Sequence, residues 1–271
     1  MTRFIVVPQW QGSASSRAMQ LIDGAEAIAG DLPTSATVRL PVPLEAGDPL
    51  GTTVQRLSAL QRVRRDLEVA VRATKDTVIV VGGDCSVAVG AVAAVAEADV
   101  ALVWLDAHPD AHTPETSPSG AFCGMALRSI LGEGPELLTL PTGAVSPTRV
   151  ILAGTRSLDL EEELFVAGEG IRMLPAATLS EHDALAEAVA ATGAARVYVH
   201  VDLDVLDPAE ISGIGSADPF GVSTADLVAS LRSLHARVPL VGASITGFAP
   251  SSPGAAVDDL GTILRIIGAL A

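Results

Sequence analysis

The chain has 271 residues, of which 49% are hydrophobic and 18% are charged, a composition typical of a folded globular protein rather than a disordered one. Its 17 basic and 32 acidic residues give a net charge of −15, which disfavours binding to nucleic acids or anionic membranes. No apolar run reaches the roughly 18 residues that a membrane-spanning helix needs, and the apolar stretch before Pro8 is too short for a signal-peptide core. We therefore expect one domain over residues 1–271, located in the cytoplasm.

Short β-branched runs alternate along the chain with longer Ala- and Leu-rich stretches of helical period. This alternation is typical of an α/β fold in which helices cover both faces of a parallel sheet. In chain order we expect a strand at Phe4–Val7, a helix over 55–74, a strand at Thr77–Val81, a helix over 87–97, strands at Ala101–Leu105 and Val150–Ala153, a helix over 183–192, a strand at Val197–Val201, a helix over 224–236, a strand at Val241–Ile245 and a helix over 256–270.

Polar side chains follow three of the predicted strands directly. Thr77–Val81 runs into Gly82-Gly83-Asp84-Cys85-Ser86, Ala101–Leu105 into Asp106-Ala107-His108-Pro109-Asp110, and Val197–Val201 into Asp202-Leu203-Asp204. In open parallel sheets, ligands bind outside the carboxyl ends of the strands. The sequence therefore places these polar groups at one edge of the sheet.

Five side chains of metal-ligand type that follow the second and third of these strands can share one site. Side chains two residues apart in an extended segment point the same way, so Asp106, His108 and Asp110 converge if that segment stays extended, as do Asp202 and Asp204. Four carboxylates brought together repel one another unless cations bind among them. This crowding favours two divalent ions that are bridged by carboxylates and hold a water or hydroxide. In the alternative interpretation the aspartates cap a helix or form turns, and His108 bonds a backbone carbonyl.

The same motifs resemble those of the ureohydrolases, the family of arginases and agmatinases, which are dinuclear manganese enzymes. The family's GGDHS, DAHxD and SxDxDxxDP motifs are similar to residues 82–86, 106–110 and 200–208, in the same order and spacing. The similarity continues through residues 113–120 and through Gly154–Asp159, which resembles the family's GxRxxD segment. It spans most of the chain from about residue 77 to 250.

The resemblance implies a three-layer α/β/α fold with a central, mainly parallel sheet. It also implies that a metal-bridging hydroxide attacks the central carbon of a guanidinium, so that urea or a urea derivative and an amine are released. Ser119 and Asp159 match positions that contact the amino-acid end of the substrate in arginases, and Asp110 is placed to hydrogen-bond the hydroxide. The implied metal ligands are Asp106, His108, Asp110, Asp202 and Asp204.

Cys85 departs from the family's pattern, because GGDHS has a metal-ligand histidine at this position. A thiolate still binds divalent metals, but it favours Zn²⁺ or Fe²⁺ over Mn²⁺ more than imidazole does. We therefore expect Cys85 as a sixth ligand in a centre of two Mn²⁺ ions, with Zn²⁺ or Fe²⁺ as alternatives. The other interpretation of Cys85 is a buried, unreactive thiol.

Two further departures concern the substrate. Cys123 stands where arginases have a histidine that assists proton transfer, and it is either an acid–base group or an apolar filler. Gly247, three residues before Pro250, stands where the family has a glutamate that pairs with the guanidinium. A buried guanidinium without that partner is costly, so we expect a less basic substrate, with N-hydroxyarginine favoured over arginine. His112 is a candidate to compensate on the substrate side, and Gly247→Glu should shift the preference back toward arginine.

Three functions stay open at this point. The first is an amidinohydrolase with a shifted substrate, the second is a degenerate homologue that binds a ligand or partner without turnover, and the third is a metal-dependent amide hydrolase. Clustered carboxylates favour an enzyme, because a protein that needs no metal gains nothing from clustering them. The expected partners are a small guanidino or amidine substrate and, by resemblance, further copies of the chain in a trimer or hexamer.

Overall fold

The computed structural model describes residues 1–271 and arranges eight strands in one sheet. The spatial order is β2-β1-β3-β8-β7-β4-β5-β6, and every neighbouring pair is parallel. The strands are β1 (Thr2–Val7), β2 (Thr37–Arg39), β3 (Thr77–Gly82), β4 (Val100–Leu105), β5 (Val150–Ala153), β6 (Arg172–Leu174), β7 (Arg196–Asp202) and β8 (Leu240–Thr246).

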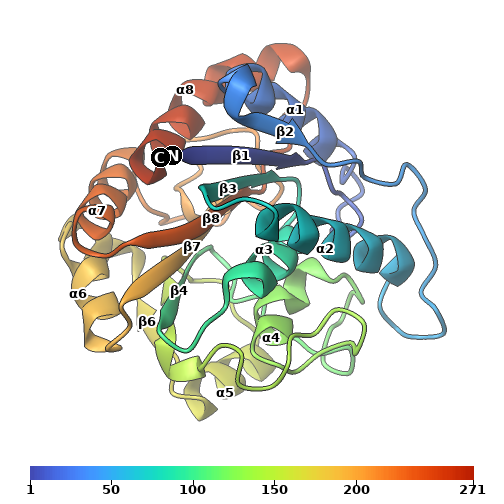
Figure 1. The fold of residues 1–271 in the computed structure, drawn as a ribbon, viewed down its shortest axis with the longest axis horizontal. Coiled ribbons are helices and arrows are strands. Elements are labelled where there is room, and N and C mark those ends of the chain that lie inside the picture. The colour runs from blue at the N-terminus through green and yellow to red at the C-terminus, as the bar shows by residue number, and fades with distance from the viewer.

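Eight α-helices cover the two faces of this sheet (Figure 1). On one face lie α1 (Gln20–Gly30), α6 (Ala184–Ala191), α7 (Thr224–Arg237) and α8 (Pro253–Leu270), which share one apolar core with the sheet. On the other lie α2 (Leu57–Arg72), α3 (Val87–Val95), α4 (Ala126–Ile130) and α5 (Leu160–Gly168), which share the second core. The predicted three-layer α/β/α architecture is confirmed.

The alternation of side chains along each strand divides the apolar residues between these two cores. In β3, Ile79 and Val81 belong to the core under α1 and α8, whereas Val78 and Val80 belong to the core under α2 and α3. Both faces of the strand are buried, which explains why the sequence shows a continuous β-branched run instead of alternating polar residues.

The six predicted strands are confirmed within two residues at each end, as are the five predicted helices within three. The prediction missed the three-residue edge strands β2 and β6 and the helices α1, α4 and α5. The strands that precede the polar motifs, β3, β4 and β7, lie in the middle of the sheet, with β8 between β3 and β7. Their carboxyl ends therefore open onto the same edge. None of the helices is long and apolar enough to cross a membrane.

Candidate metal centre

A cavity of about 450 Å³ lies at the carboxyl ends of the central strands. All six residues predicted as metal ligands line it: Cys85, Asp106, His108, Asp110, Asp202 and Asp204. Each of the four aspartates is less than 10% exposed, and Cys85 is 6% exposed. The structure thus brings the three sequence motifs to one buried site.

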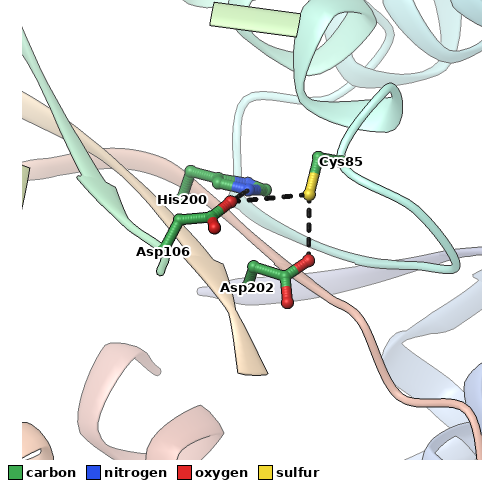
Figure 2. A group of neighbouring side chains, drawn as sticks. All are labelled: Cys85, Asp106, His200 and Asp202. Atoms are coloured by element: carbon green, nitrogen blue, oxygen red, sulfur yellow. Dashed lines mark hydrogen bonds and ion pairs between the residues drawn. The ribbon is translucent and has the colours of Figure 1, made fainter. Parts of the chain in front are cut away.

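A first group of possible ligand atoms comes from Cys85, Asp106, His200 and Asp202 (Figure 2). The Cys85 Sγ lies 2.9 Å from Asp202 Oδ2 and 3.7 Å from Asp106 Oδ2. Thr246, at the end of β8, donates its hydroxyl to Asp202 Oδ2 at 2.9 Å. One ligand atom from each of the four residues lies within 4.8 Å of the other three, close enough to surround one ion.

A second group comes from Asp106, His108 and Asp204. The His108 Nδ1 lies 3.0 Å from Asp204 Oδ2 and 3.4 Å from Asp106 Oδ1. The other carboxylate oxygen of Asp204 accepts the backbone N–H of Ala107 at 3.0 Å, which ties the loop after β7 to the loop after β4. Asp106 belongs to both groups, so its two oxygens can reach two neighbouring ions.

Asp110 reaches the site in a different way from the one we predicted. The segment 106–110 does not stay extended, because Asp106 accepts the backbone N–H of His108 in a tight turn and Asp110 adopts a left-handed conformation with φ of 50°. The expectation of an extended segment was therefore wrong, although Asp110 still lines the cavity. Its Oδ2 is buried and has no hydrogen-bond partner in the protein.

The electrostatics of the site reflect the crowding of its carboxylates. Burial and the neighbouring Asp204 raise the pKa of Asp202 to about 6, and burial together with Asp106 raises the pKa of Asp204 to about 6. The pKa of Asp110 is raised well above its usual value, mainly by burial and then by Asp106. Burial alone would lower the pKa of His108, but its carboxylate partners Asp106 and Asp204 raise it to about 12. The site thus needs positive charge.

Both cysteines lie beside this negative charge. Burial, followed by repulsion from Asp202, raises the pKa of Cys85 well above its usual value, and burial followed by Asp110 does the same for Cys123. A divalent ion deprotonates a coordinating thiol, so Cys85 can become a thiolate only with such an ion beside it. Cys123 lines the cavity too, but it is in neither group of ligand atoms.

Of the residues expected on the substrate side, His112 and Ser119 line the cavity, whereas Asp159 does not. Glu162, in the first turn of α5, also lines the cavity. The His112 Nε2 is 3.4 Å from Asp159 Oδ2 and 3.7 Å from Glu162 Oε1. Asp159 is half exposed and caps the N-terminus of α5, where its side chain accepts the N–H of Glu162.

Gly247 follows β8 and also lines the cavity, but its backbone rules out the restoration that the sequence suggested. Its φ is +88°, and a Cβ at this position would lie 2.2 Å from Asp202 Oδ1. A glutamate here would first displace Asp202, so Gly247→Glu cannot simply add a carboxylate to an unchanged pocket. The expected shift toward arginine therefore does not follow from this structure.

Four residues that the sequence analysis did not single out contribute to the site. His200 and Glu162 were described above, and Asp218 Oδ2 lies 3.5 Å from His108 Nε2. Arg156 donates to six backbone carbonyls, including those of Asp204 and Asp218, and so fixes the loop after β7. The signal for His200 was present, because it precedes Asp202 by two residues and therefore lies on the same face of β7.

A model of the arginase family matches residues 14–256 of the chain. The chain belongs to the arginase family. Family members related to it are metal-dependent ureohydrolases that act on C–N bonds. Among them, the arginase of Staphylococcus aureus is 36% identical over 169 residues, and that of Bacillus caldovelox is 36% identical over 207 residues.

These alignments cover 58% and 69% of this chain, and 55% and 65% of the two arginases. The chain thus matches somewhat less than two thirds of the length of these curated relatives. Among solved structures, Entamoeba histolytica arginase in complex with L-ornithine has a TM-score of 0.87 to this chain at 24% identity, covering 99% of this chain and 97% of that one. The arginase fold is therefore shared over the whole chain.

Proposed function

We propose that the chain is a dinuclear-metal amidinohydrolase that hydrolyses a C–N bond of a guanidino or related amidine substrate. The observation that carries this proposal is the position of Asp106 between two groups of ligand atoms at the base of one cavity. Water adds across the guanidino carbon, a urea-type product keeps the new oxygen, and the leaving nitrogen departs as an amine.

The donor atoms fit two divalent cations. Asp106, His108 and Asp204 offer oxygen and imidazole donors, a set that suits Mn²⁺. The group with Cys85 adds a soft sulfur, which makes Zn²⁺ or Fe²⁺ stronger competitors for that position. Asp110, with its unpartnered Oδ2, would complete the set together with Asp202. When bound, the two ions would lower the pKa of water and supply the nucleophile.

Asp110 is the residue that would hold the proton taken from the attacking water. Its buried carboxylate lines the cavity and has an oxygen, Oδ2, without a hydrogen-bond partner in the protein, which leaves an acceptor for that proton. Cys123 does not suit this task as a base, because burial keeps its thiol protonated. We therefore assign proton transfer to Asp110. Cys123 is then a neutral part of the cavity wall near the reacting groups.

The missing carboxylate at Gly247 argues for a substrate of low basicity. The buried carboxylate of Asp84, next to Cys85 in the chain, does not replace it, because the oxygens of Asp84 already accept hydrogen bonds from Gln9, Gly12 and Ser86. It is not free to pair with a guanidinium. An N-hydroxyl group withdraws electron density and lowers the basicity of a guanidine, so the neutral form of N-hydroxyarginine can be bound without a new anionic partner.

The amino-acid end of such a substrate would lie against Ser119, His112 and Asp159. Asp159 is half exposed at the N-terminus of α5 and offers a carboxylate to an ammonium group, whereas His112 and Ser119 can donate to a carboxylate. The charges of a zwitterionic α-amino acid are therefore complementary to this end of the cavity.

We also propose that the chain forms a trimer or hexamer of identical subunits, as its resemblance to the ureohydrolases implies. Light scattering coupled to size-exclusion chromatography would give the mass of the assembly, and a monomer would contradict this proposal. The cytoplasmic location remains a prediction.

The test of the proposed function compares kcat/KM for arginine and N-hydroxyarginine at one fixed concentration of Mn²⁺. This ratio reports the difference in transition-state stabilisation between the two substrates. We expect a higher kcat/KM for N-hydroxyarginine, with the amine and the hydroxylated urea formed in equal amounts. Equal values or a preference for arginine would refute the substrate assignment. Bound metal without turnover of any guanidine, amidine or amide would instead support the ligand-binding homologue.

A further inference from the structure

We propose that His200 supplies the imidazole ligand that Cys85 does not, so that the histidine of one metal position has moved from the loop after β3 to the strand β7. This inference rests on the proposed metal centre. A departure in each of two motifs falls in one cluster: Cys85 stands where GGDHS has histidine, and His200 stands where SxDxDxxDP has serine. Each change alone alters the set of ligand atoms in this cluster, whereas the two changes together keep one imidazole in the cluster.

The distances from Asp106 to the two other side chains suit a shared ion. His200 Nε2 lies 4.0 Å from Asp106 Oδ2, and Cys85 Sγ lies 3.7 Å from the same oxygen. Ligand atoms around one tetrahedral ion are roughly 3.3–3.8 Å apart when their bonds to the ion are about 2.0–2.3 Å long. A separation of 4.0 Å is too long for a hydrogen bond between His200 and Asp106, but it leaves room for an ion between them.

The His200 ring is fully buried, and its Nε2 has no hydrogen-bond partner in the protein. A buried nitrogen without a hydrogen-bond partner costs free energy of folding. A histidine that only packed in the core would offer nothing to offset this cost. In Figure 2 the ring comes from β7, and its nitrogen lies beside the carboxylate of Asp106. The unpartnered Nε2 is thus aimed at the group of ligand atoms.

Two neighbours hold the ring in the orientation that a ligand needs. The His200 Nδ1 lies 2.8 Å from Ser244 Oγ in the adjacent strand β8, so Nδ1–H can donate to this hydroxyl and leave the lone pair on Nε2. The Trp104 ring stacks on His200 with centroids 3.8 Å apart and fixes the ring plane. Metal-ligating histidines commonly donate their second N–H to a partner of this kind.

The experiment uses three variants of the full chain: His200→Ser, Cys85→His, and the double variant that carries both changes. Titration calorimetry with Co²⁺ and with Mn²⁺, together with elemental analysis, gives the affinity and the number of bound ions. We expect wild type to bind two ions, His200→Ser to lose at least about tenfold in affinity at one of them, and the double variant to recover affinity to within a few-fold of wild type. His235→Ser is the matched control, because His235 lies in the last turn of α7 and does not line the cavity, and it should leave both affinities unchanged.

A second readout needs no variant. In the Co²⁺-loaded wild-type protein, the N–H protons of ligated imidazoles give strongly shifted NMR signals that disappear in D₂O. We expect two such signals, from His108 and His200, and one signal would overturn the inference. It would also be overturned if a folded His200→Ser, with an unchanged metal-free melting temperature, bound both ions with wild-type affinity. Wild-type protein that binds no ion would refute the proposed function itself, which separates the two failures.

Discussion

A single methyl group added at Gly247 should weaken metal binding, because the backbone there lies against Asp202. In Gly247→Ala the new Cβ would lie 2.2 Å from Asp202 Oδ1, whereas an ordinary contact needs about 3.4 Å. The carboxylate, or the backbone after β8, must therefore move by about 1.2 Å. A metal site tolerates errors of only about 0.2 Å in its ligand distances, so the methyl group removes Asp202 from productive coordination.

The effect on stability should be much smaller than the effect on the metal. A left-handed conformation costs a residue with a side chain about 1–2 kcal/mol, and a chain of this size loses about 2–4 °C in Tm for each kcal/mol. We therefore expect the metal-free variant to melt about 2–8 °C below wild type. Its affinity for Mn²⁺ should fall by at least about 100-fold at one position, since a ligand displaced by about 1 Å is effectively lost.

Gly143→Ala is the matched control, because Gly143 has a similar φ of +82° but nothing within 4 Å of a Cβ added there. Both variants place a side chain at a similar positive φ, but only the Cβ of Gly247→Ala would clash with Asp202. Titration calorimetry with Mn²⁺ and thermal melts of the metal-free proteins compare them directly. Equal metal affinities for the two variants would refute the reasoning.

Three further predictions follow from the site. Asp204→Asn should abolish one bound ion, because a neutral amide replaces a charged ligand, and elemental analysis that finds two ions would contradict this. In the metal-free protein the pKa of Asp202 and the pKa of Asp204 are each raised to about 6, so the contribution of these residues to stability is full below the unfolded value of 3.8 and is lost as the pH rises through 6. Metal-free Asp204→Asn should therefore gain Tm relative to wild type as the pH rises from about 4 to about 6, and a constant difference over this range would count against it. Asp218→Asn should weaken the ion held by His108 by about 10–100-fold, since Asp218 Oδ2 lies 3.5 Å from the Nε2 of that ring, and unaltered affinity in calorimetry would reject this role.

The middle of the sheet and its polar edge could be predicted from the sequence, because buried parallel strands appear as β-branched runs and each ends directly in charged residues. The helix α1 could not be predicted in this way. It contains Gly24, which lowers helix propensity, and a Cβ at that position would lie 1.9 Å from the carbonyl oxygen of Phe248. The close approach of two segments more than 200 residues apart in sequence, and not local preference, selects this glycine.

The site shows the same division between local and long-range causes. The spacing of the aspartates placed Asp106, Asp202 and Asp204 together correctly, since it depends only on the strands that precede them. The left-handed turn at Asp110 depends on contacts with residues later in the chain, including the hydrogen bond from Arg128 N–H in α4 to Asp110 C=O at 3.2 Å. The sequence signal for α5 was available, because Asp159 and Glu162 form a capping box with the usual spacing of three.

The central claim is that Asp106 lies between two metal ions at the base of the cavity, and anomalous diffraction from crystals of the Mn²⁺-loaded protein tests it most directly. The account predicts two anomalous peaks about 3.5–4 Å apart, one beside Cys85 and His200 and the other beside His108 and Asp204, with Asp106 contacting both. A single peak, or two peaks that Asp106 does not join, would contradict it.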